Sequence, residues 1–306
     1  CTSEKVYRLS EPEAISFNLT ISSFGNFNIS CFNANDGWID ITPSGGNGNY
    51  TYIWSTNNGS GLTDGTQDQS GLGPGTYSLT LRDSNNNEIS DNFILVQPDQ
   101  LILDESELSD YNGFEVSCFG GSDGEIKLVN ITGGHGEANR TYSWVGPNGF
   151  TSNSRNISNL IVGEYTVTIT DSYLDNNTND TGSCEIKQSF TLDSPEDFTF
   201  NFTKRDYNGF NVSCNGDSDG GIDITVSGGY LDPGSDYVYS WTGPNGFSSN
   251  SEDISSLIAG SYQLSGADNN GCLLPNTTID VIEPNALTIT LVSTPTDCDQ
   301  PSGTIS

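Results

Sequence analysis

The residues in this sequence best suited to covalent chemistry are its seven cysteines. None of them has the Cys-x-x-Cys or Cys/His spacing of a zinc site, so thiolate metal binding is not expected. Two pairs of cysteines follow one another at similar spacings: Cys184 comes 66 residues after Cys118, and Cys272 comes 58 residues after Cys214. A disulfide closing a loop of that size stabilises a fold by roughly 4 kcal/mol in the chain-entropy model. We therefore predict two disulfides, Cys118–Cys184 and Cys214–Cys272.

The alternative for these cysteines is that they are buried small apolar side chains, a common state of free cysteine. A third stretch, nearer the N-terminus, has an order of residues similar to that of the stretches that contain these two pairs. In it Cys31 corresponds to Cys118 and Cys214, but Asn87 occupies the position that corresponds to Cys272, so a second cysteine is missing. We expect Cys31 to be a buried free thiol. Any partners of Cys1 and Cys298 are expected outside this sequence.

Acidic side chains beside glycine turns form the second group with chemical potential. Carboxylate oxygens near such turns are suitable ligands for calcium. The sequence offers five candidates: Asp217, Asp219 and Asp223 in NGDSDGGID, together with Asp123 and Glu125. The pattern lacks the terminal Glu of an EF-hand loop, and Asp and Gly are also ordinary turn residues. Calcium is the one cofactor hypothesis, beside the simpler interpretation as turns.

Catalysis has little support in the sequence. The single histidine, His135, follows a glycine pair and has no counterpart in the rest of the chain, so we expect a solvated loop residue. Carboxylate pairs that cleave glycosidic bonds are compatible with the composition. Such a site normally occupies one large pocket, however, whereas this chain repeats one pattern. We predict that the chain is not an enzyme.

The charge balance excludes two classes of partner. Nine Lys and Arg stand against 40 Asp and Glu, a net charge of −31. Binding to nucleic acid or to an anionic membrane needs cations that are scarce here. No apolar run reaches the roughly 20 residues that span a bilayer. The chain begins without Met or a signal peptide, so we expect an internal piece of a longer extracellular protein.

The elements that must position these residues repeat along the chain. Prolines followed three residues later by an apolar anchor recur at Pro12, Pro98, Pro195 and Pro284. They divide the chain into three complete repeats: repeat 1 (13–98), repeat 2 (99–195) and repeat 3 (196–284). Residues 1–12 are expected to end a preceding repeat, and residues 285–306 to start a following one.

Within each repeat the same landmarks follow one another. An early cysteine precedes Asp-Gly, an alternating run, a Gly pair, a Trp, Gly-x-Tyr and an Asp. The early cysteine ends DYNGFEVSC in repeat 2, DYNGFNVSC in repeat 3 and the looser SSFGNFNISC in repeat 1. We expect Asp-Gly and Gly-Gly to supply the positive φ of tight hairpin turns.

Alternating runs such as TYSLTLRD and EYTVTITD have the period of β-strands. About seven short strands per repeat predict an all-β fold, a tandem array of immunoglobulin-like β-sandwich modules. Six aromatic residues are expected to fill the cores: Trp54, Trp144, Trp241, Tyr77, Tyr165 and Tyr262.

The order of motifs resembles the SprB repeat. The clearest copies are VSCFGGSDGEIKL…YSWVGPNGF…VGEYTVTITDS and VSCNGDSDGGIDITVSGG…YSWTGPNGF…AGSYQLSGADNNGC. Repeat 1 departs from the pattern at Asn87. The resemblance implies an immunoglobulin-like sandwich in very large surface adhesins of gliding Bacteroidota, which are exported by type IX secretion and moved by the gliding machinery.

We therefore expect a non-catalytic, extended repeat segment of a cell-surface adhesin, attached to the outer membrane through other parts of the parent protein. Its expected partners are neighbouring repeats of the same chain, surface polysaccharide or the substratum, and, through other parts of the parent, gliding or secretion machinery. The alternatives are spacer modules of a secreted polysaccharide-degrading enzyme, or glycan-binding modules that use exposed aromatics such as Phe150 and Phe247.

Overall fold

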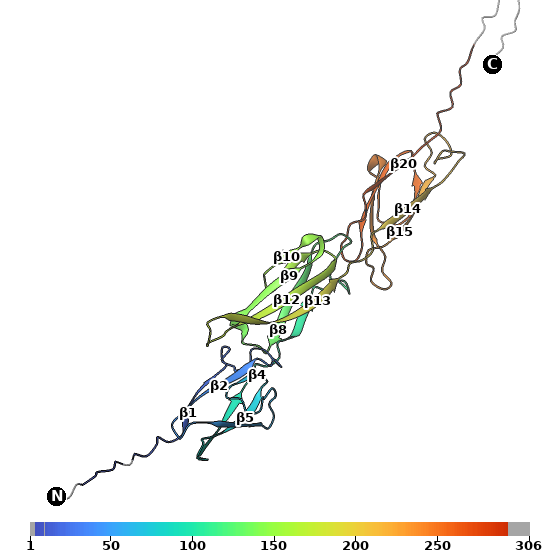
Figure 1. Cartoon of the computed structure of the whole chain (residues 1–306). Coiled ribbons are helices and arrows are strands. Elements are labelled where there is room, and N and C mark those ends of the chain that lie inside the picture. The colour runs from blue at the N-terminus through green and yellow to red at the C-terminus, as the bar shows by residue number, and fades with distance from the viewer. Residues whose placement is uncertain (1–3, 9, 293–306) are drawn as a thin grey trace, which may run out of the picture. The chain divides into compact units, whose positions relative to one another are not determined.

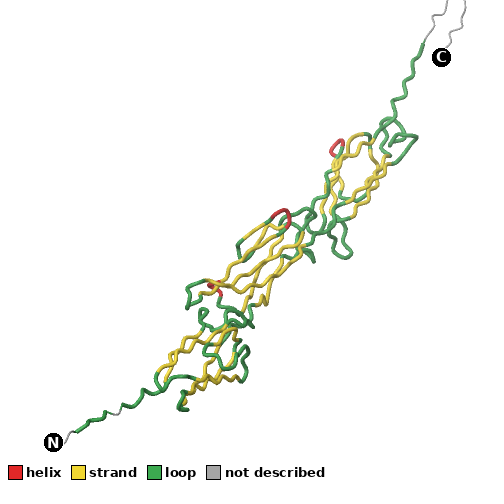
Figure 2. The backbone as a smooth tube through the Cα atoms, in the orientation of Figure 1, coloured by secondary structure: helices red, strands yellow, loops and turns green. Residues whose placement is uncertain are grey.

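The structure is a computed structural model that describes residues 4–8 and 10–292. Within these residues twenty strands and three short 3-10 turns make up the regular structure (Figure 1). Strands and the loops that join them account for nearly all of the backbone trace (Figure 2). The predicted all-β class is confirmed.

Each repeat contains six or seven of the described strands. Repeat 1 contains β1 (Ser16–Ile21), β2 (Gly37–Ser44), β3 (Thr51–Thr56), β4 (Gln69–Leu72), β5 (Gly75–Arg82) and β6 (Glu88–Leu95). Repeat 2 contains β7 (Ile102–Leu108), β8 (Gly124–Thr132), β9 (Arg140–Val145), β10 (Thr151–Ser152), β11 (Ile157–Leu160), β12 (Gly163–Leu174) and β13 (Thr181–Leu192). Repeat 3 contains β14 (Thr199–Lys204), β15 (Gly220–Ser227), β16 (Val238–Thr242), β17 (Ser248–Ser249), β18 (Ile254–Leu257), β19 (Gly260–Ala267) and β20 (Thr277–Val281). The 3-10 turns are η1 (Glu137–Asn139), η2 (Pro147–Gly149) and η3 (Pro244–Gly246).

In every repeat the strands form two antiparallel sheets. Their orders are β1-β2-β4 and β3-β5-β6 in repeat 1, β11-β8-β7 and β10-β9-β12-β13 in repeat 2, and β14-β15-β18 and β17-β16-β19-β20 in repeat 3. Buried residues alternate with more exposed ones along β5, β8 and β12, so one face of each sheet is directed into a core. Two antiparallel sheets of about seven strands are the immunoglobulin-like architecture. The predicted array of such modules is confirmed.

The aromatic residues expected in the cores are deeply buried. All six are at most 7% exposed: Trp54, Trp144, Trp241, Tyr77, Tyr165 and Tyr262. In each repeat the tyrosine hydroxyl donates to the backbone carbonyl four residues upstream: Tyr77 to Gly73 at 2.7 Å, Tyr165 to Ile161 at 3.1 Å and Tyr262 to Ile258 at 3.1 Å. Burial raises the pKa of all three hydroxyls. The arrangement is similar to the tyrosine corner of immunoglobulin-like domains.

The two kinds of glycine motif have different roles. Both members of every Gly pair have positive φ, as predicted: Gly45, Gly46, Gly133, Gly134, Gly228 and Gly229. The prediction of tight turns at Asp-Gly is wrong, because Gly37, Gly124 and Gly220 begin β2, β8 and β15. A Cβ on Gly37 would collide with the Ile29 side chain and the Leu72 carbonyl, so close packing excludes a side chain there.

The chain divides into two compact units, which are described separately. The first consists of Cys1–Ser109 and Asp123–Leu192, and the second of Asp110–Ser122 and Asp193–Ser306. No described strand crosses the expected repeat boundaries at residues 98–99 and 195–196. The units do not coincide with the repeats, because the segment Asp110–Ser122 of repeat 2 belongs to the unit that contains repeat 3.

Candidate functional site: the disulfide junctions

The Gly pair and the buried aspartate of each repeat belong to one hydrogen-bonded unit. In repeat 1 the Gly46 amide donates to the Glu13 carbonyl at 2.7 Å, and the Asn47 amide donates to Asp83 Oδ2 at 3.0 Å. Repeats 2 and 3 have the same bonds: Gly134 to Asp99 and Gly229 to Glu196, then His135 to Asp171 and Tyr230 to Asp268. These contacts tie the start of each repeat to a buried aspartate, which begins the turn between the last two long strands in repeats 1 and 3 and lies within β12 in repeat 2.

That turn, which we call the late turn, holds the aspartate in repeats 1 and 3 in the same way. Asp268 Oδ1 accepts the backbone amides of Asn270 at 2.9 Å and Cys272 at 2.8 Å. Asp83 accepts the amides of the equivalent residues, Asn85 and Asn87, and the side-chain amide of Asn87 as well. The Asn87 hydrogen bonds, with those from Asn47 and Asn85, lower the pKa of Asp83 to about 2. Asn87 therefore replaces a cysteine while keeping the turn.

The predicted disulfide pairing is wrong, although three of its four cysteines are bonded. The two bonds are Cys31–Cys184 and Cys118–Cys272, with Cα–Cα distances of 5.8 and 5.5 Å. Cys31 is not a free thiol, whereas Cys214 is free and exposed. Each bond joins the early cysteine of one repeat to the last two long strands of the next: Cys272 lies in the late turn of repeat 3, and Cys184 lies within β13 of repeat 2. Cys1 and Cys298 lie outside the described residues.

The reason for this pairing is visible within repeat 3. We call the segment that ends at the early cysteine the cysteine loop: residues 23–31, 110–118 and 206–214. In repeat 3 this loop is fixed beyond the end of β20, because the Asn211 amide donates to the Ile282 carbonyl at 2.8 Å. Cys272 precedes β20, whose five residues span roughly 16 Å. Cys214 and Cys272 therefore lie toward opposite ends of the repeat, too far apart for a disulfide.

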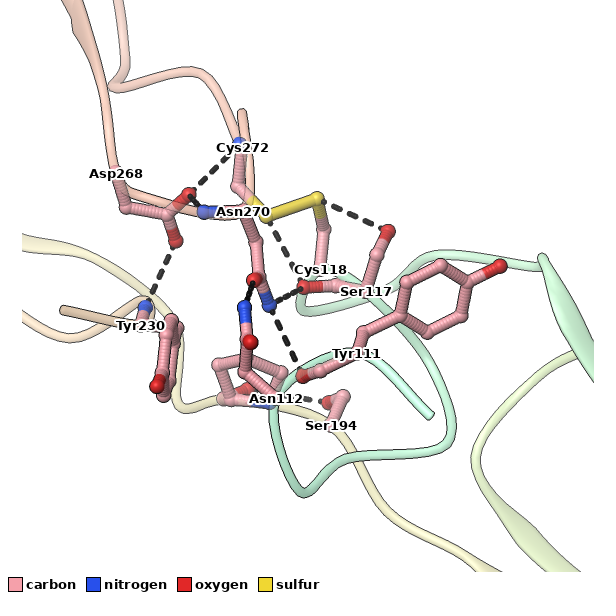
Figure 3. Close-up of a disulfide and its surroundings, with 10 residues drawn as sticks. Tyr111, Asn112, Ser117, Cys118, Ser194, Tyr230, Asp268, Asn270 and Cys272 are labelled. Atoms are coloured by element: carbon pink, nitrogen blue, oxygen red, sulfur yellow. Dashed lines mark hydrogen bonds between the residues drawn. A yellow bond between two sulfur atoms is a disulfide. The ribbon is translucent and has the colours of Figure 1, made fainter. Parts of the chain in front are cut away.

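The junction at Cys118 includes a side chain inserted into the cysteine loop (Figure 3). The Asn270 side-chain amide donates to the carbonyls of Ser117 at 3.1 Å and Tyr111 at 3.4 Å. Its oxygen accepts a hydrogen bond from the Asn112 side chain at 2.7 Å. The rings of Phe114 and Tyr230 meet edge to face, with centroids 6.4 Å apart. Polar, aromatic and covalent contacts thus coincide at one place.

The junction at Cys31 uses the longer hairpin between β12 and β13. The Asn176 side chain donates to Ser23 Oγ at 2.8 Å and to the Gly25 carbonyl at 2.9 Å. The Ser23 amide donates to the Asn177 side chain at 2.9 Å, and the Gly25 amide donates to the Leu174 carbonyl at 2.7 Å. Although the hairpin is an insertion compared with repeat 3, its asparagines also bind the cysteine loop.

His135 belongs to this first junction, so the expectation of a solvated loop residue is wrong. Its ring stacks on Tyr173 with centroids 4.8 Å apart and meets Phe27 edge to face at 5.3 Å. Its Nε2 lies 2.6 Å from the Ser30 carbonyl. The sequence contains no signal for this role, because Phe27 and Ser30 belong to another repeat.

The five calcium candidates are not brought together. Among residues 4–8 and 10–292, no group of three or more His, Cys, Asp or Glu could hold a metal ion. Asp219 accepts the Ser213 amide and Asp217 accepts the Ser213 hydroxyl, so both stabilise the cysteine loop. The hydrogen bond from the Ser213 amide lowers the pKa of Asp219. Asp223 is paired with Thr203 in the sheet, Glu125 forms an ion pair with Lys127 at 2.8 Å, and Asp123 precedes β8.

The aromatic residues considered for glycan binding are not exposed platforms. Phe150 and Phe247 are half-buried. Each ring packs edge to face on a core tyrosine, Phe150 on Tyr165 at 5.3 Å and Phe247 on Tyr262 at 5.2 Å. Their positions after the Pro-Asn-Gly turns serve core packing.

Fold and junctions together define a class of protein: an array of immunoglobulin-like sandwiches cross-linked from one repeat to the next. A family model, the SprB repeat, matches three parts of the chain, residues 28–59, 115–149 and 210–246. These matches confirm the resemblance seen in the sequence, and each covers an early cysteine and the Trp strand. Both the SprB repeat and the all-β fold are typical of non-catalytic structural modules.

Other comparisons add little. No curated protein matches the chain significantly. Among solved structures, the four N-terminal Ig domains of Dscam1 isoform 8.4 align with 10% identity and a TM-score of 0.22, covering 91% of this chain and 74% of that one. The described residues contain no helix long and apolar enough to cross a membrane. Disulfides persist in oxidising surroundings, so together with the SprB repeats they indicate an extracellular surface protein.

Proposed function

We propose that this chain is a load-bearing repeat segment of a very large cell-surface adhesin that serves surface adhesion and gliding motility. The observation that carries the proposal is the covalent connection between consecutive repeats, Cys31–Cys184 and Cys118–Cys272. A filament that transmits force to a surface benefits from such bonds, because a disulfide is not broken by the thermal opening of a domain.

The SprB repeats support the gliding context and export by type IX secretion, with attachment to the outer membrane through other parts of the parent protein. The buried aromatic residues, and the carboxylates of Asp217 and Asp219 that bind the cysteine loop, support a structural role over catalysis. Neighbouring repeats are the immediate partners, and surface polysaccharide or the substratum are the proposed targets of the whole filament.

Antibodies raised against residues 1–306 provide the test. On intact cells of the source organism they should label the surface, and antibody-coated beads should be carried along gliding cells. Deletion of the repeats from the parent gene should reduce attachment to glass. Labelling that appears only after cell lysis would contradict the proposal. Unchanged attachment combined with lost polysaccharide degradation would favour spacer modules of an enzyme.

A further inference from the structure

The cysteine loop of repeat 3 has the same conformation as the loop of repeat 2 but no occupant among the described residues. Residues 110–118 and 206–214 differ at one position, DYNGFEVSC against DYNGFNVSC. In both, the tyrosine amide donates to the phenylalanine carbonyl at 2.7 Å, and the glycine amide donates to the aspartate side chain at 2.7 Å: Tyr111, Phe114, Gly113 and Asp110, and Tyr207, Phe210, Gly209 and Asp206. The loop therefore has this conformation without contacts from a late turn among the described residues.

The two loops, 110–118 and 206–214, differ in exposure at the positions where the loop of repeat 2 is contacted by repeat 3. Phe114 and Cys118 are half-buried, whereas their equivalents are exposed: Phe210 at 38%, and the free thiol of Cys214. The exposed surface of residues 206–214 thus presents a ring, asparagine side chain and thiol in the arrangement that binds Tyr230, Asn270 and Cys272 one repeat earlier.

We propose that residues 206–214 are the docking surface for the late turn of a fourth SprB-type repeat in the same chain, closed by a disulfide from Cys214. The late turn that fits has the pattern Asp-x-Asn-x-Cys, as in residues 268–272. Its asparagine accepts from the Asn208 side chain and donates to the carbonyls of Tyr207 and Ser213. The disulfide forms by thiol–disulfide exchange in the oxidising compartment outside the cell. The two thiols give up two electrons and two protons, and the disulfide of the exchange partner accepts them and becomes two thiols.

Two observations favour an occupant in the same chain over a second molecule. Both observed junctions join consecutive repeats. In addition, the segment leaving repeat 3 is held beside Cys214, because the Asn215 side chain donates to the Pro284 carbonyl at 3.0 Å and the Gly216 amide donates to Glu283 at 2.7 Å. A following repeat therefore starts beside the surface, at high effective concentration. The inference rests on the repeat array alone and does not require the proposed adhesin function.

The test is a variant chain in which a second copy of residues 196–284 follows residue 284. This copy supplies a late turn in the natural connection, since Pro284 repeats Pro195. Non-reducing peptide mapping is expected to recover Cys214 of repeat 3 bonded to the copy's Cys272, with Cys118–Cys272 as the internal control. The copy's own Cys214 should remain a titratable thiol.

Asn208→Gly in repeat 3 tests the docking contact itself. Loss of its side chain should lower the ratio of closed to open disulfide in a glutathione buffer by about tenfold. The matched control is Asn245→Gly, because both asparagines have positive φ, 56° and 55°, and glycine keeps that conformation.

Three outcomes would overturn the inference. The first is a free Cys214 in the extended chain while Cys118–Cys272 is formed. The second is equal sensitivity to the two glycine substitutions. The third is a Cys214–Cys214 dimer of the original chain, which would place a second copy on this surface. Any of them leaves the adhesin proposal intact, since that is tested on cells.

Discussion

Asn270 illustrates how single residues hold these junctions together. Its side chain makes three hydrogen bonds to the cysteine loop of repeat 2, two as donor and one as acceptor. The backbone amide of the same residue is bound by Asp268, which fixes the direction of the side chain. One residue thus joins the late turn of its own repeat to the loop of the preceding repeat.

Asn270→Ala should make the Cys118–Cys272 bond easier to reduce. Three hydrogen bonds are removed, each worth about 1 kcal/mol net, so the ratio of closed to open disulfide in glutathione buffers should fall by a factor on the order of a hundred. Alkylation and mass spectrometry measure the ratio. Asn201→Ala, at an exposed strand position of the same repeat, is the control, and Cys31–Cys184 should be unchanged in both variants. An equal ratio in the two variants would show that the side chain adds nothing to the junction.

Asp83 provides a pH-dependent contribution to repeat 1. Its pKa is lowered to about 2 by Asn87 and neighbouring amides, so the folded state favours the carboxylate. The stabilisation is therefore complete above the unfolded pKa of about 4 and is lost as the pH falls toward 2. Hydrogen exchange of repeat 1 peptides should show Asp83→Asn destabilised at pH 6 and the difference from the natural chain shrinking below pH 4. A difference that stays constant from pH 6 to pH 2 would argue against this role.

At the scale of elements, the Gly pair holds each repeat's first residues against its buried aspartate, which in repeat 3 is Asp268 of the late turn. A Cβ on Gly228 would collide with the Asp197 carbonyl, whereas one on Gly234 would meet nothing within 4 Å. Both residues have positive φ, 94° and 85°, so alanine is strained equally at the two positions. The collision is thus isolated from the conformational effect.

Gly228→Ala should destabilise repeat 3 by about 2 kcal/mol more than Gly234→Ala, because backbone atoms must separate to admit the methyl group. Hydrogen exchange of peptides from β14–β20 is the measurement, since it reports on repeat 3 alone. Equal protection in the two variants would mean that the backbone at Asp197 moves away from the methyl group without loss of structure.

The elements also show what a sequence can and cannot predict. Strand period, core aromatics and Gly-Gly turns follow from local chemistry, and the structure has them where the sequence places them. The disulfide partners do not follow from the sequence, because loop length says nothing about which end of a sandwich carries each cysteine. His135, Asn176 and Asn270 were missed as junction residues for a related reason: their partners lie in another repeat, and no local pattern encodes them.

At the scale of the whole molecule, the two disulfides create a covalent network. Cys31 is bonded to Cys184 and Cys118 to Cys272, so the two bonded pairs are connected by three chain segments in parallel. These segments contain 87, 66 and 88 residues, the differences between cysteine numbers 31, 118, 184 and 272. When tension is applied at the two chain ends, the extension between the bonded pairs is therefore limited by the shortest segment, 118–184.

Single-molecule pulling should reveal this limit. With both disulfides intact, 66 residues can extend between the bonded pairs, whereas reduction frees all 241 from residue 31 to residue 272. At about 3.5 Å per residue, reductant should add roughly 600 Å of contour length. A Cys118→Ser, Cys272→Ser double variant should gain length without reductant. Full extension of the oxidised chain would rule out the network.

The same topology makes the molecule tolerant of a broken backbone. A protease site inserted at Gly234 lies in segment 184–272, in an open loop, and cleavage there leaves the other two segments joined. The cleaved chain should run as one species without reductant and as two fragments with it. Cleavage of the Cys272→Ser variant should release the C-terminal fragment at once, as should a site at the exposed Leu287, beyond the network. The chain thus stays connected after a single cut between Cys31 and Cys272, and release of the fragment from the oxidised natural chain would exclude this protection.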